Sequence, residues 1–247
     1  STRLPRAIRD VYKRQVMLST ANVQRDSISF HVIVVLTGLS LLWFFNLISH
    51  FLVGMFSDWS IRMLQITSQS LTLMAAIGAW LALERTLGGM PRLGTFKSNH
   101  FLAGVLALVV IDYFGVALKS TLGEGAETSM ARDQVFVSTG MLLPVFIGSV
   151  ILAPLMEELI FRGYLLRAPN MERSTRAAML AIFASAGIFS VTHFNYENTS
   201  SFVAIFFVGV VLGLARIASG GLLLPVALHM AANAKVLISM IKTAWLN

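Results

Sequence analysis

Three charged side chains interrupt an otherwise apolar stretch at residues 153–166, which has the sequence APLMEELIFRGYLL. Glu158 and Arg162 are four residues apart, so on a helix they share one face, where carboxylate and guanidinium can pair and offset each other's desolvation. On its own this pair suits a structural role. Glu157 has no such partner on its own helix. A buried carboxylate without a counter-ion favours its protonated form, and a carboxylate that exchanges a proton near neutral pH suits a general base.

Two further apolar runs carry polar side chains at helical spacing. His229 and Asn233 are four residues apart, and so are Phe189 and His193, so the members of each pair point the same way from their helix. A single histidine in such a run is as often a hydrogen-bonded packing residue as a functional one. Three helices that each offer a polar group favour one shared site. A carboxylate base, imidazoles and an amide donor are the parts of a hydrolase, in which the base activates water and the donors stabilise an oxyanion.

These residues form three motifs, E-E-x-x-x-R, F-x-x-x-H and H-x-x-x-N, in this order and each within an apolar run. Together they resemble the motifs of the CPBP family of intramembrane proteases. That family contains CAAX proteases and bacteriocin-processing enzymes, is also called the Abi family, and includes the Rce1-type prenyl-protein endopeptidases (CAAX prenyl protease 2-like). The resemblance covers about residues 135–245. It implies an intramembrane endopeptidase that hydrolyses a peptide bond in a membrane-associated protein or peptide.

The resemblance also implies a role for each motif residue. Glu157 would be the base that activates water, helped by His193. His229 and Asn233 would hold the oxyanion. The supporting residues would be Glu158, Arg162 and Phe189.

The cofactor and the protease class follow from what else the sequence contains. No metal is favoured, but Glu157, His193 and His229 would also suit a zinc site with two histidines, one glutamate and an open position for water, and the family is often labelled metalloprotease for that reason. Other intramembrane protease chemistries are excluded, because the chain has no H-E-x-x-H, G-x-S-G or G-x-G-D motif. Asp112 is the single aspartate within a span, which excludes an aspartyl dyad. We expect Asp112 to be a buried, hydrogen-bonded packing residue.

The composition is that of a multi-pass membrane protein. Of 247 residues, 56% are hydrophobic and 13% charged, and the mean hydropathy is +0.74. Soluble domains are about half apolar and about a quarter charged. The absence of cysteine excludes disulfides, thiolate catalysis, Fe–S clusters and cysteine-ligated zinc. The net charge of +7 lies on Lys and Arg between apolar segments, which favours contact with anionic lipid and argues against a nucleic-acid partner.

Seven apolar runs are long enough to cross a bilayer, and they must be helical because lipid offers the backbone no hydrogen-bond partners. They predict an all-α transmembrane bundle of about seven to eight helices. The fourth run is longer than a bilayer requires and contains Pro144 and Pro154, so we expect it to be tilted, kinked or split in two. Gly209 and Gly213 form a G-x-x-x-G motif that predicts close helix packing. The runs cover residues 30–56, 62–83, 100–118, 135–166, 177–193, 201–218 and 222–245.

The expected domains are a basic N-terminal tail (1–29), N-terminal transmembrane helices (30–134) and a catalytic transmembrane core (135–247). Residues 7–15 resemble translated sequencing-adapter sequence, so the first 15 residues are given little weight as native sequence. The first apolar run is far longer than the apolar part of a signal peptide, which predicts a retained anchor. With a cytoplasmic N-terminus, fourteen Lys and Arg lie on inner segments and four at outer ends, which predicts that orientation in the cell membrane.

The spacing along the chain predicts that His193 and Glu157 lie at different heights along their helices. If the fourth and fifth runs form a hairpin that turns near Glu172, Glu157 lies 15 residues before the turn and His193 lies 21 after it. This difference corresponds to about 9 Å of helix. A loop centred elsewhere, or a kink at Pro154, would remove it.

Two other function classes remain open from the sequence. A non-catalytic membrane scaffold or bacteriocin-immunity protein could have the same fold, although it would be free to lose motif residues that are all present here. A small-solute transporter is disfavoured because such proteins usually show repeated halves. The expected partners are therefore the lipid bilayer and a membrane-associated protein or peptide substrate.

Overall fold

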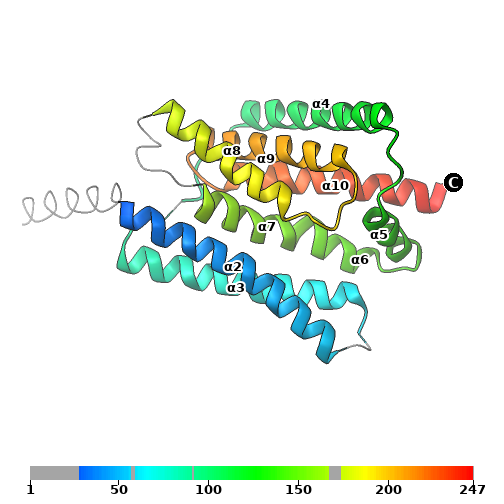
Figure 1. Ribbon diagram of the computed structural model, residues 1–247, viewed down its shortest axis with the longest axis horizontal. Helices are drawn as coiled ribbons and strands as arrows, with labels where there is room; N and C mark the ends of the chain where they lie inside the picture. Colours follow the sequence, from blue (N-terminus) through cyan, green and yellow to red (C-terminus); the bar gives the residue numbers. More distant parts are fainter. Residues whose placement is uncertain (1–27, 57–58, 91, 167–173, 247) are drawn as a thin grey trace, which may run out of the picture.

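The computed structural model describes residues 28–56, 59–90, 92–166 and 174–246, and its helices pack into one bundle (Figure 1). The first 27 residues of the expected N-terminal tail lie outside the described residues, as does the turn expected near Glu172. Within the described ranges the chain is helical, with no β-strand. In this part of the chain, six helices are long and apolar enough to cross a membrane. The prediction of an all-α transmembrane bundle is therefore confirmed.

The helices correspond closely to the predicted runs, with two differences. The fifth run forms a helix of only 17 residues, shorter than the six candidate spans. The fourth run begins with a separate short helix. The elements are α2 (Ile28–Met55), α3 (Ile61–Thr86), α4 (Ser98–Leu122), α5 (Thr128–Ser138), α6 (Leu142–Val145), η1 (Phe146–Leu152), α7 (Ala153–Glu158), η2 (Leu159–Leu165), α8 (Thr175–Val191), α9 (Thr199–Ser219) and α10 (Leu223–Leu246).

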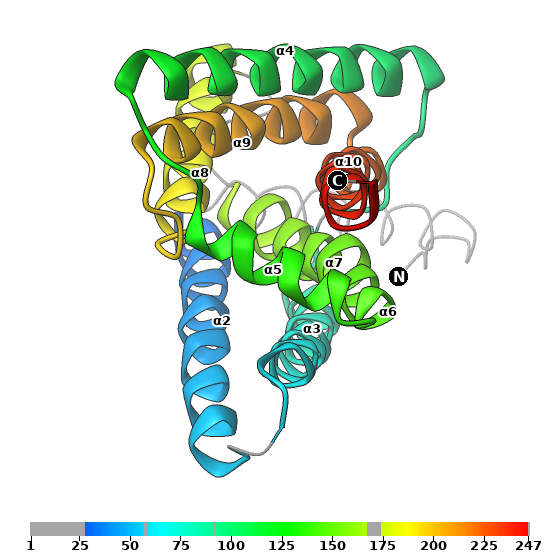
Figure 2. The ribbon, with the colours of Figure 1, turned by 90° about the vertical axis from the view of Figure 1, so that its right-hand side faces the viewer.

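The fourth predicted run is split, which was one of the outcomes expected from its length and prolines. The break lies at Gly140, whose φ of 85° ends α5 in a conformation that glycine adopts without strain. α5, which precedes the break, runs across the view in Figure 2, where α10 is seen nearly end-on, so these two contacting helices cross at a large angle. The helix that follows, residues 142–165, is continuous and counts as one candidate span.

This continuous helix of residues 142–165 lies at the centre of the bundle. Figure 2 shows it between the α2–α3 pair on one side and the layer of α8, α9 and α10 on the other. Two of its segments, η1 and η2, are π-helical, with hydrogen bonds that reach back five residues. Pro154 follows the first of these segments and supplies no amide hydrogen. α4 packs outside α9, and each of its residues is at least partly exposed.

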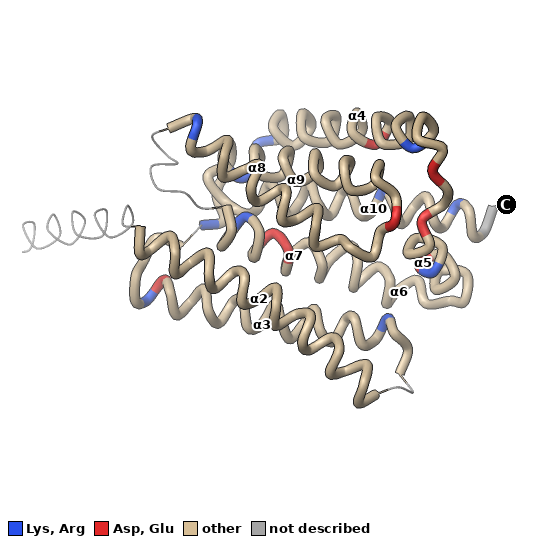
Figure 3. The backbone as a smooth tube through the Cα atoms, in the orientation of Figure 1, with Lys and Arg blue, Asp and Glu red and all other residues tan. Residues whose placement is uncertain are grey.

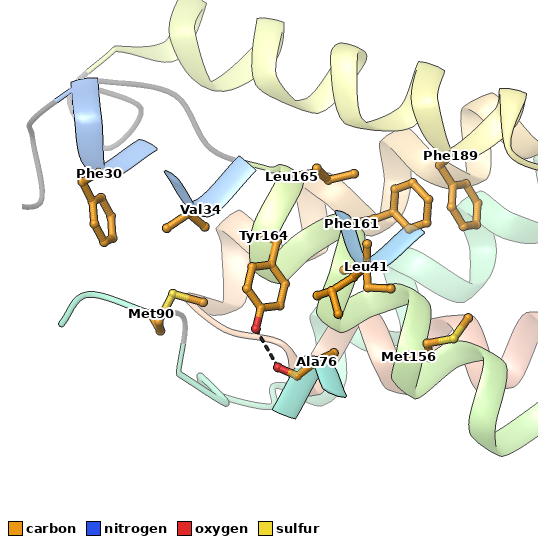
Figure 4. Close-up of a cluster of buried hydrophobic side chains, with 11 residues drawn as sticks. Phe30, Val34, Leu41, Ala76, Met90, Met156, Phe161, Tyr164, Leu165 and Phe189 are labelled. Carbon is orange, nitrogen blue, oxygen red and sulfur yellow. Dashed lines mark hydrogen bonds between the residues drawn. The ribbon is translucent and has the colours of Figure 1, made fainter. Parts of the chain in front are cut away.

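The largest buried apolar cluster joins the central helix to α2 and α3 (Figure 4). Tyr164, which is fully buried, donates a hydrogen bond of 2.6 Å from its hydroxyl to the Ala76 carbonyl oxygen of α3. A Cβ at Gly38 of α2 would lie 2.8 Å from the Tyr164 Cβ, so α2 approaches η2 very closely. The central helix is thereby fixed on the side away from α9 and α10.

The glycine motif of α9 allows close packing on α8, as predicted. A Cβ at Gly209 would lie 3.0 Å from the Ala186 Cβ, and one at Gly213 would lie 3.0 Å from Ile182. Both distances are shorter than ordinary contacts, so larger residues would separate the helices.

The expectation for Asp112 is wrong in one respect. Asp112 is exposed, because α4 is the outermost helix, and its carboxylate forms an ion pair with Lys235 of α10. It therefore joins two helices at their surface and is not a buried packing residue.

Candidate active site

The two adjacent glutamates lie at the C-terminal end of α7, in the middle of the bundle. Figure 3 shows the acidic part of α7 surrounded mainly by uncharged segments of the neighbouring helices. Consecutive residues of a helix point about 100° apart, so the two carboxylates face different neighbours. Glu158 is fully buried, whereas the Glu157 side chain retains 20% exposure.

The buried Glu158 carboxylate is held by two charged or polar partners. Arg162 donates from Nη1 to Glu158 Oε1 at 2.9 Å, which is the pair expected from the spacing, and from Nη2 to the Gly209 carbonyl oxygen at 3.0 Å. His229 Nδ1 lies 2.8 Å from the same Oε1. A carboxylate that is ionised can only accept, so Nδ1 carries the hydrogen and the ring orientation is fixed. Glu158 therefore connects α7, η2 and α10.

The His229 ring lies between the two glutamates. While Nδ1 is directed at Glu158, Nε2 lies 3.7 Å from Glu157 Oε2. Two carboxylates and one guanidinium thus lie around a single imidazole. A carboxylate and an imidazole are both groups that can exchange a proton in catalysis.

The Phe189 ring packs against both histidines. It packs edge-on against His193 at 4.7 Å and against His229 at 5.8 Å between ring centroids. The Arg162 guanidinium carbon lies 4.7 Å from the centre of the same ring, a cation–π contact. Phe189 itself is 2% exposed. The phenylalanine of the F-x-x-x-H motif therefore packs against the Arg162 guanidinium and both imidazoles.

His193 lies just after the end of α8, the helix that packs against η2. Ser185 of α8 donates to the Phe161 carbonyl oxygen of η2 at 3.1 Å. The His193 Nδ1 lies 2.7 Å from the Phe189 carbonyl oxygen, so the ring turns back toward α8. The turn on which the expected offset depends lies outside the described residues, so the offset stays a prediction. No hydrogen bond joins His193 to Glu157 among the described residues.

The loop that carries His193 is anchored by Glu127, a residue that sequence reasoning missed. The Glu127 carboxylate, 5% exposed, accepts from the backbone amides of Glu197 at 2.9 Å and Asn198 at 3.1 Å. In the same loop, burial raises the pKa of the Tyr196 phenol to about 12, and the Asp133, Glu127 and Glu157 carboxylates act in the same direction. The loop therefore lies within electrostatic reach of Glu157. No motif marks Glu127, because its partners are backbone groups distant in sequence.

Asn233 lies one turn along α10 from His229 and contacts the main chain of η1. Its side-chain Nδ2 donates to the Ser149 carbonyl oxygen at 2.8 Å. The amide thus lies on the side of α10 that faces the central helix, as the H-x-x-x-N spacing predicts. One of its two hydrogens is already engaged.

This geometry also bears on the alternative zinc site of Glu157, His193 and His229. Among the described residues, no group of three or more His, Asp or Glu is placed to hold a metal ion. His193 and His229 both direct Nδ1 at an acceptor and keep Nε2 available, which is common for metal-bound histidines. Yet Glu157, His193 and His229 do not converge as three ligands, so the residues as placed do not fit zinc.

A cavity of about 420 Å³ is lined in part by Leu159, the residue after Glu158, and by none of the motif residues. Most of its wall is apolar, and it lies beside the C-terminal part of α3 and the segment before α4. Its other lining residues are Ile77, Trp80, Glu84, Met90, Arg92, Leu93 and Leu222.

Comparison with known proteins identifies the family. A family model described as type II CAAX prenyl endopeptidase Rce1-like matches residues 139–235, which hold all three motifs. An uncharacterized 24.3 kDa protein of Escherichia coli is 32% identical over 170 residues, 67% of this chain and 76% of that protein. The membrane-embedded CAAX protease MroQ of Staphylococcus aureus (strain USA300) is 30% identical over 138 residues, 53% of this chain and 54% of that protein. No solved structure matches this chain.

The matched region coincides with the helices that carry the two glutamates, the arginine, both histidines and the asparagine. The chain is a multi-pass membrane protein that belongs to the CPBP family of intramembrane proteases.

Proposed function

We propose that the protein is an intramembrane endopeptidase in which Glu157 activates water and His229 and Asn233 stabilise the oxyanion. The substrate is a membrane-associated protein or peptide. The observation that carries the proposal is the placement of His229, whose Nδ1 is fixed by Glu158 while Nε2 faces Glu157. This leaves the Glu157 carboxylate and an imidazole nitrogen on either side of one position where a water and a peptide carbonyl can meet.

The proposed reaction starts with Glu157 ionised and His229 protonated. With His229 protonated, two carboxylates face one guanidinium and one imidazolium, so the buried cluster is neutral. Glu157 is then an ionised base, and His229 Nε2–H is a donor. Both are the states that water activation and oxyanion stabilisation require.

Hydrolysis then follows in two steps. Glu157 takes a proton from water as the oxygen attacks the peptide carbonyl, and the negative charge that develops on the carbonyl oxygen is met by His229 Nε2–H and the free Asn233 N–H. Glu157 next gives its proton to the leaving nitrogen as the carbon–nitrogen bond breaks. His193, whose Nε2 is uncommitted, assists Glu157 by orienting the water. The products are a carboxylic acid and an amine.

The cavity beside Leu159 supports a role in substrate binding. We assign it to an apolar side chain of the substrate, since its wall is mostly apolar and includes Leu159 of the central helix. The distribution of Lys and Arg supports a cytoplasmic position for this end of the bundle. We therefore expect cleavage near the cytoplasmic surface of the cell membrane.

New protein termini in cells test the proposal. Membranes from cells that express the wild type, Glu157→Gln or Glu197→Gln are compared by mass spectrometry of N-terminal peptides. Glu197 is an exposed glutamate between α8 and α9, so the same substitution there is a matched control. We expect termini that occur with the wild type and the control and are missing with Glu157→Gln. Identical termini with all three would support the non-catalytic scaffold instead.

Metal content tests the cofactor. Purified protein is assayed for zinc, and cleavage is measured with and without a chelator. Activity without stoichiometric zinc supports Glu157 as the sole activator. Stoichiometric zinc whose removal abolishes cleavage would replace this mechanism with a metal-dependent one.

A further inference from the structure

Pro154 and the oxyanion residue Asn233 meet at one main-chain carbonyl. In η1 the hydrogen bonds reach back five residues, and the last of them runs from the Ala153 amide to the Gly148 carbonyl oxygen. The next bond in this register would run from residue 154 to the Ser149 carbonyl oxygen. Residue 154 is proline and has no amide hydrogen. The Ser149 carbonyl is thus left without its helical donor.

The Asn233 side chain satisfies this carbonyl. Nδ2 donates to the Ser149 oxygen at 2.8 Å, across the contact between α10 and η1. A partly buried carbonyl in a membrane span needs such a donor, because an unsatisfied polar group in lipid is costly. The missing bond at Pro154 and the amide of Asn233 are therefore complementary.

We propose that Pro154 is a positioning residue for Asn233. A carbonyl oxygen can only accept, so Asn233 cannot turn its amide over without setting Oδ1 against the Ser149 oxygen. The first Nδ2 hydrogen is fixed on Ser149, and the second is held in the amide plane, free to donate. Pro154 precedes Glu157 by three residues and shares its helix face. The proline that leaves the Ser149 carbonyl to Asn233 and the proposed base therefore lie on one turn of the helix. This inference rests on the proposed role of Asn233.

The test is Pro154→Ala, which restores an amide hydrogen that competes for the Ser149 carbonyl. The assay uses a fluorogenic peptide that spans the most strongly Glu157-dependent cleavage site found in cells, with purified protein in liposomes. Loss of one orienting hydrogen bond predicts a kcat about fivefold lower. KM should not change, because an oxyanion donor acts in the transition state. Pro144→Ala is the matched control, since Pro144 lies in the first turn of α6, where amides have no helical acceptor.

The double variant separates positioning from a general structural role. In the Asn233→Ala background, Pro154→Ala should cause no further loss of kcat. The unfolding midpoint of Pro154→Ala should equal or exceed that of the wild type, because a helix bond is gained. Where the alanine variant does not fold, Pro154→Val, which keeps more volume, is measured in the same way.

Three results would overturn the inference. These are an unchanged kcat in Pro154→Ala, an equal loss in Pro144→Ala, or the same fold loss with and without Asn233. In each case Glu157→Gln would still be inactive if the proposed function is right. Full activity of Glu157→Gln would instead overturn the proposed function itself.

Discussion

At the scale of single residues, the two adjacent glutamates have different surroundings and different expected roles. Glu158 is fully buried and bonded to Arg162 and His229, whereas Glu157 is partly exposed and lies 3.7 Å from His229 Nε2. The first carboxylate can hold the structure together, and the second can exchange a proton with water. One residue of helix rotation produces this division.

The buried pair predicts different stabilities for the two glutamine variants. Glu158→Gln leaves the Arg162 guanidinium buried without its closest counter-charge, and removing one partner of a buried ion pair costs about 3–5 kcal/mol. We expect a clearly lower unfolding midpoint for Glu158→Gln and a nearly unchanged one for Glu157→Gln, measured in the same detergent. Glu158→Gln combined with Arg162→Met should recover much of the loss. Equal midpoints for the two single variants would show that the pair does not hold the fold.

Spacing within one helix predicted some of these contacts and not others. The pair of Glu158 and Arg162 follows from an i, i+4 relation, and it forms as expected. The bond from His229 to Glu158 joins residues 71 apart, so its existence depends on the rotation of two helices about their axes. The sequence carries no local sign of that rotation. Glu127 was missed for a related reason, since it binds backbone amides and not a motif side chain.

At the scale of elements, the position of α9 determines how the arginine is held. The Gly209 carbonyl of α9 accepts from Arg162, and this contact requires α9 to lie close against α8. The glycine motif was recognisable in the sequence as a packing signal. Its second consequence, a main-chain acceptor for the buried guanidinium, was not predictable because it depends on where the central helix lies.

Gly209→Ala should disturb both contacts. Its Cβ would lie 3.0 Å from the Ala186 Cβ, so α9 must move outward, at a cost of about 1–3 kcal/mol in the free energy of unfolding. Gly187→Ala in α8 is the control, because a Cβ there meets nothing within 4 Å. The control should be neutral or more stable by about 0.5–1 kcal/mol. The comparison is made by thermal unfolding, and a loss in Gly187→Ala as large as in Gly209→Ala would contradict the packing argument.

For the run from 135 to 166, the composition did not predict which of several distortions the helix adopts. Its length and its prolines indicated a tilt, kink or split, and the structure splits it at Gly140. The choice among these depends on how α5 packs against α10, a contact between residues far apart in sequence.

At the scale of the whole molecule, hydropathy predicted the class of fold and most of its spans. Lipid restricts the chain to helices, so a count of apolar runs goes far toward the architecture. Polar groups on three helices favoured one shared site, and the family resemblance pointed to the same residues. The offset of His193 was calculated from residue counts, and because the connecting turn lies outside the described residues it stays a prediction.

The expected orientation can be tested with single cysteines, because the chain has no cysteine of its own. Thr175→Cys, at the start of α8, should be protected from a membrane-impermeant maleimide in intact spheroplasts and labelled in inverted vesicles. Gly125→Cys, between α4 and α5, should show the reverse. Both positions are exposed in the structure. The opposite labelling pattern would place the N-terminus outside and contradict the distribution of Lys and Arg.

The most direct test of water activation by Glu157 is the cleavage rate of purified protein in liposomes, measured with the same fluorogenic peptide. A general base contributes about 10²–10⁴-fold to a rate, so Glu157→Gln should lower kcat by at least about a hundredfold while the protein stays folded. Glu197→Gln should cleave at the wild-type rate. A Glu157→Gln variant that is folded and cleaves as fast as the wild type would contradict the assignment of Glu157 as the base.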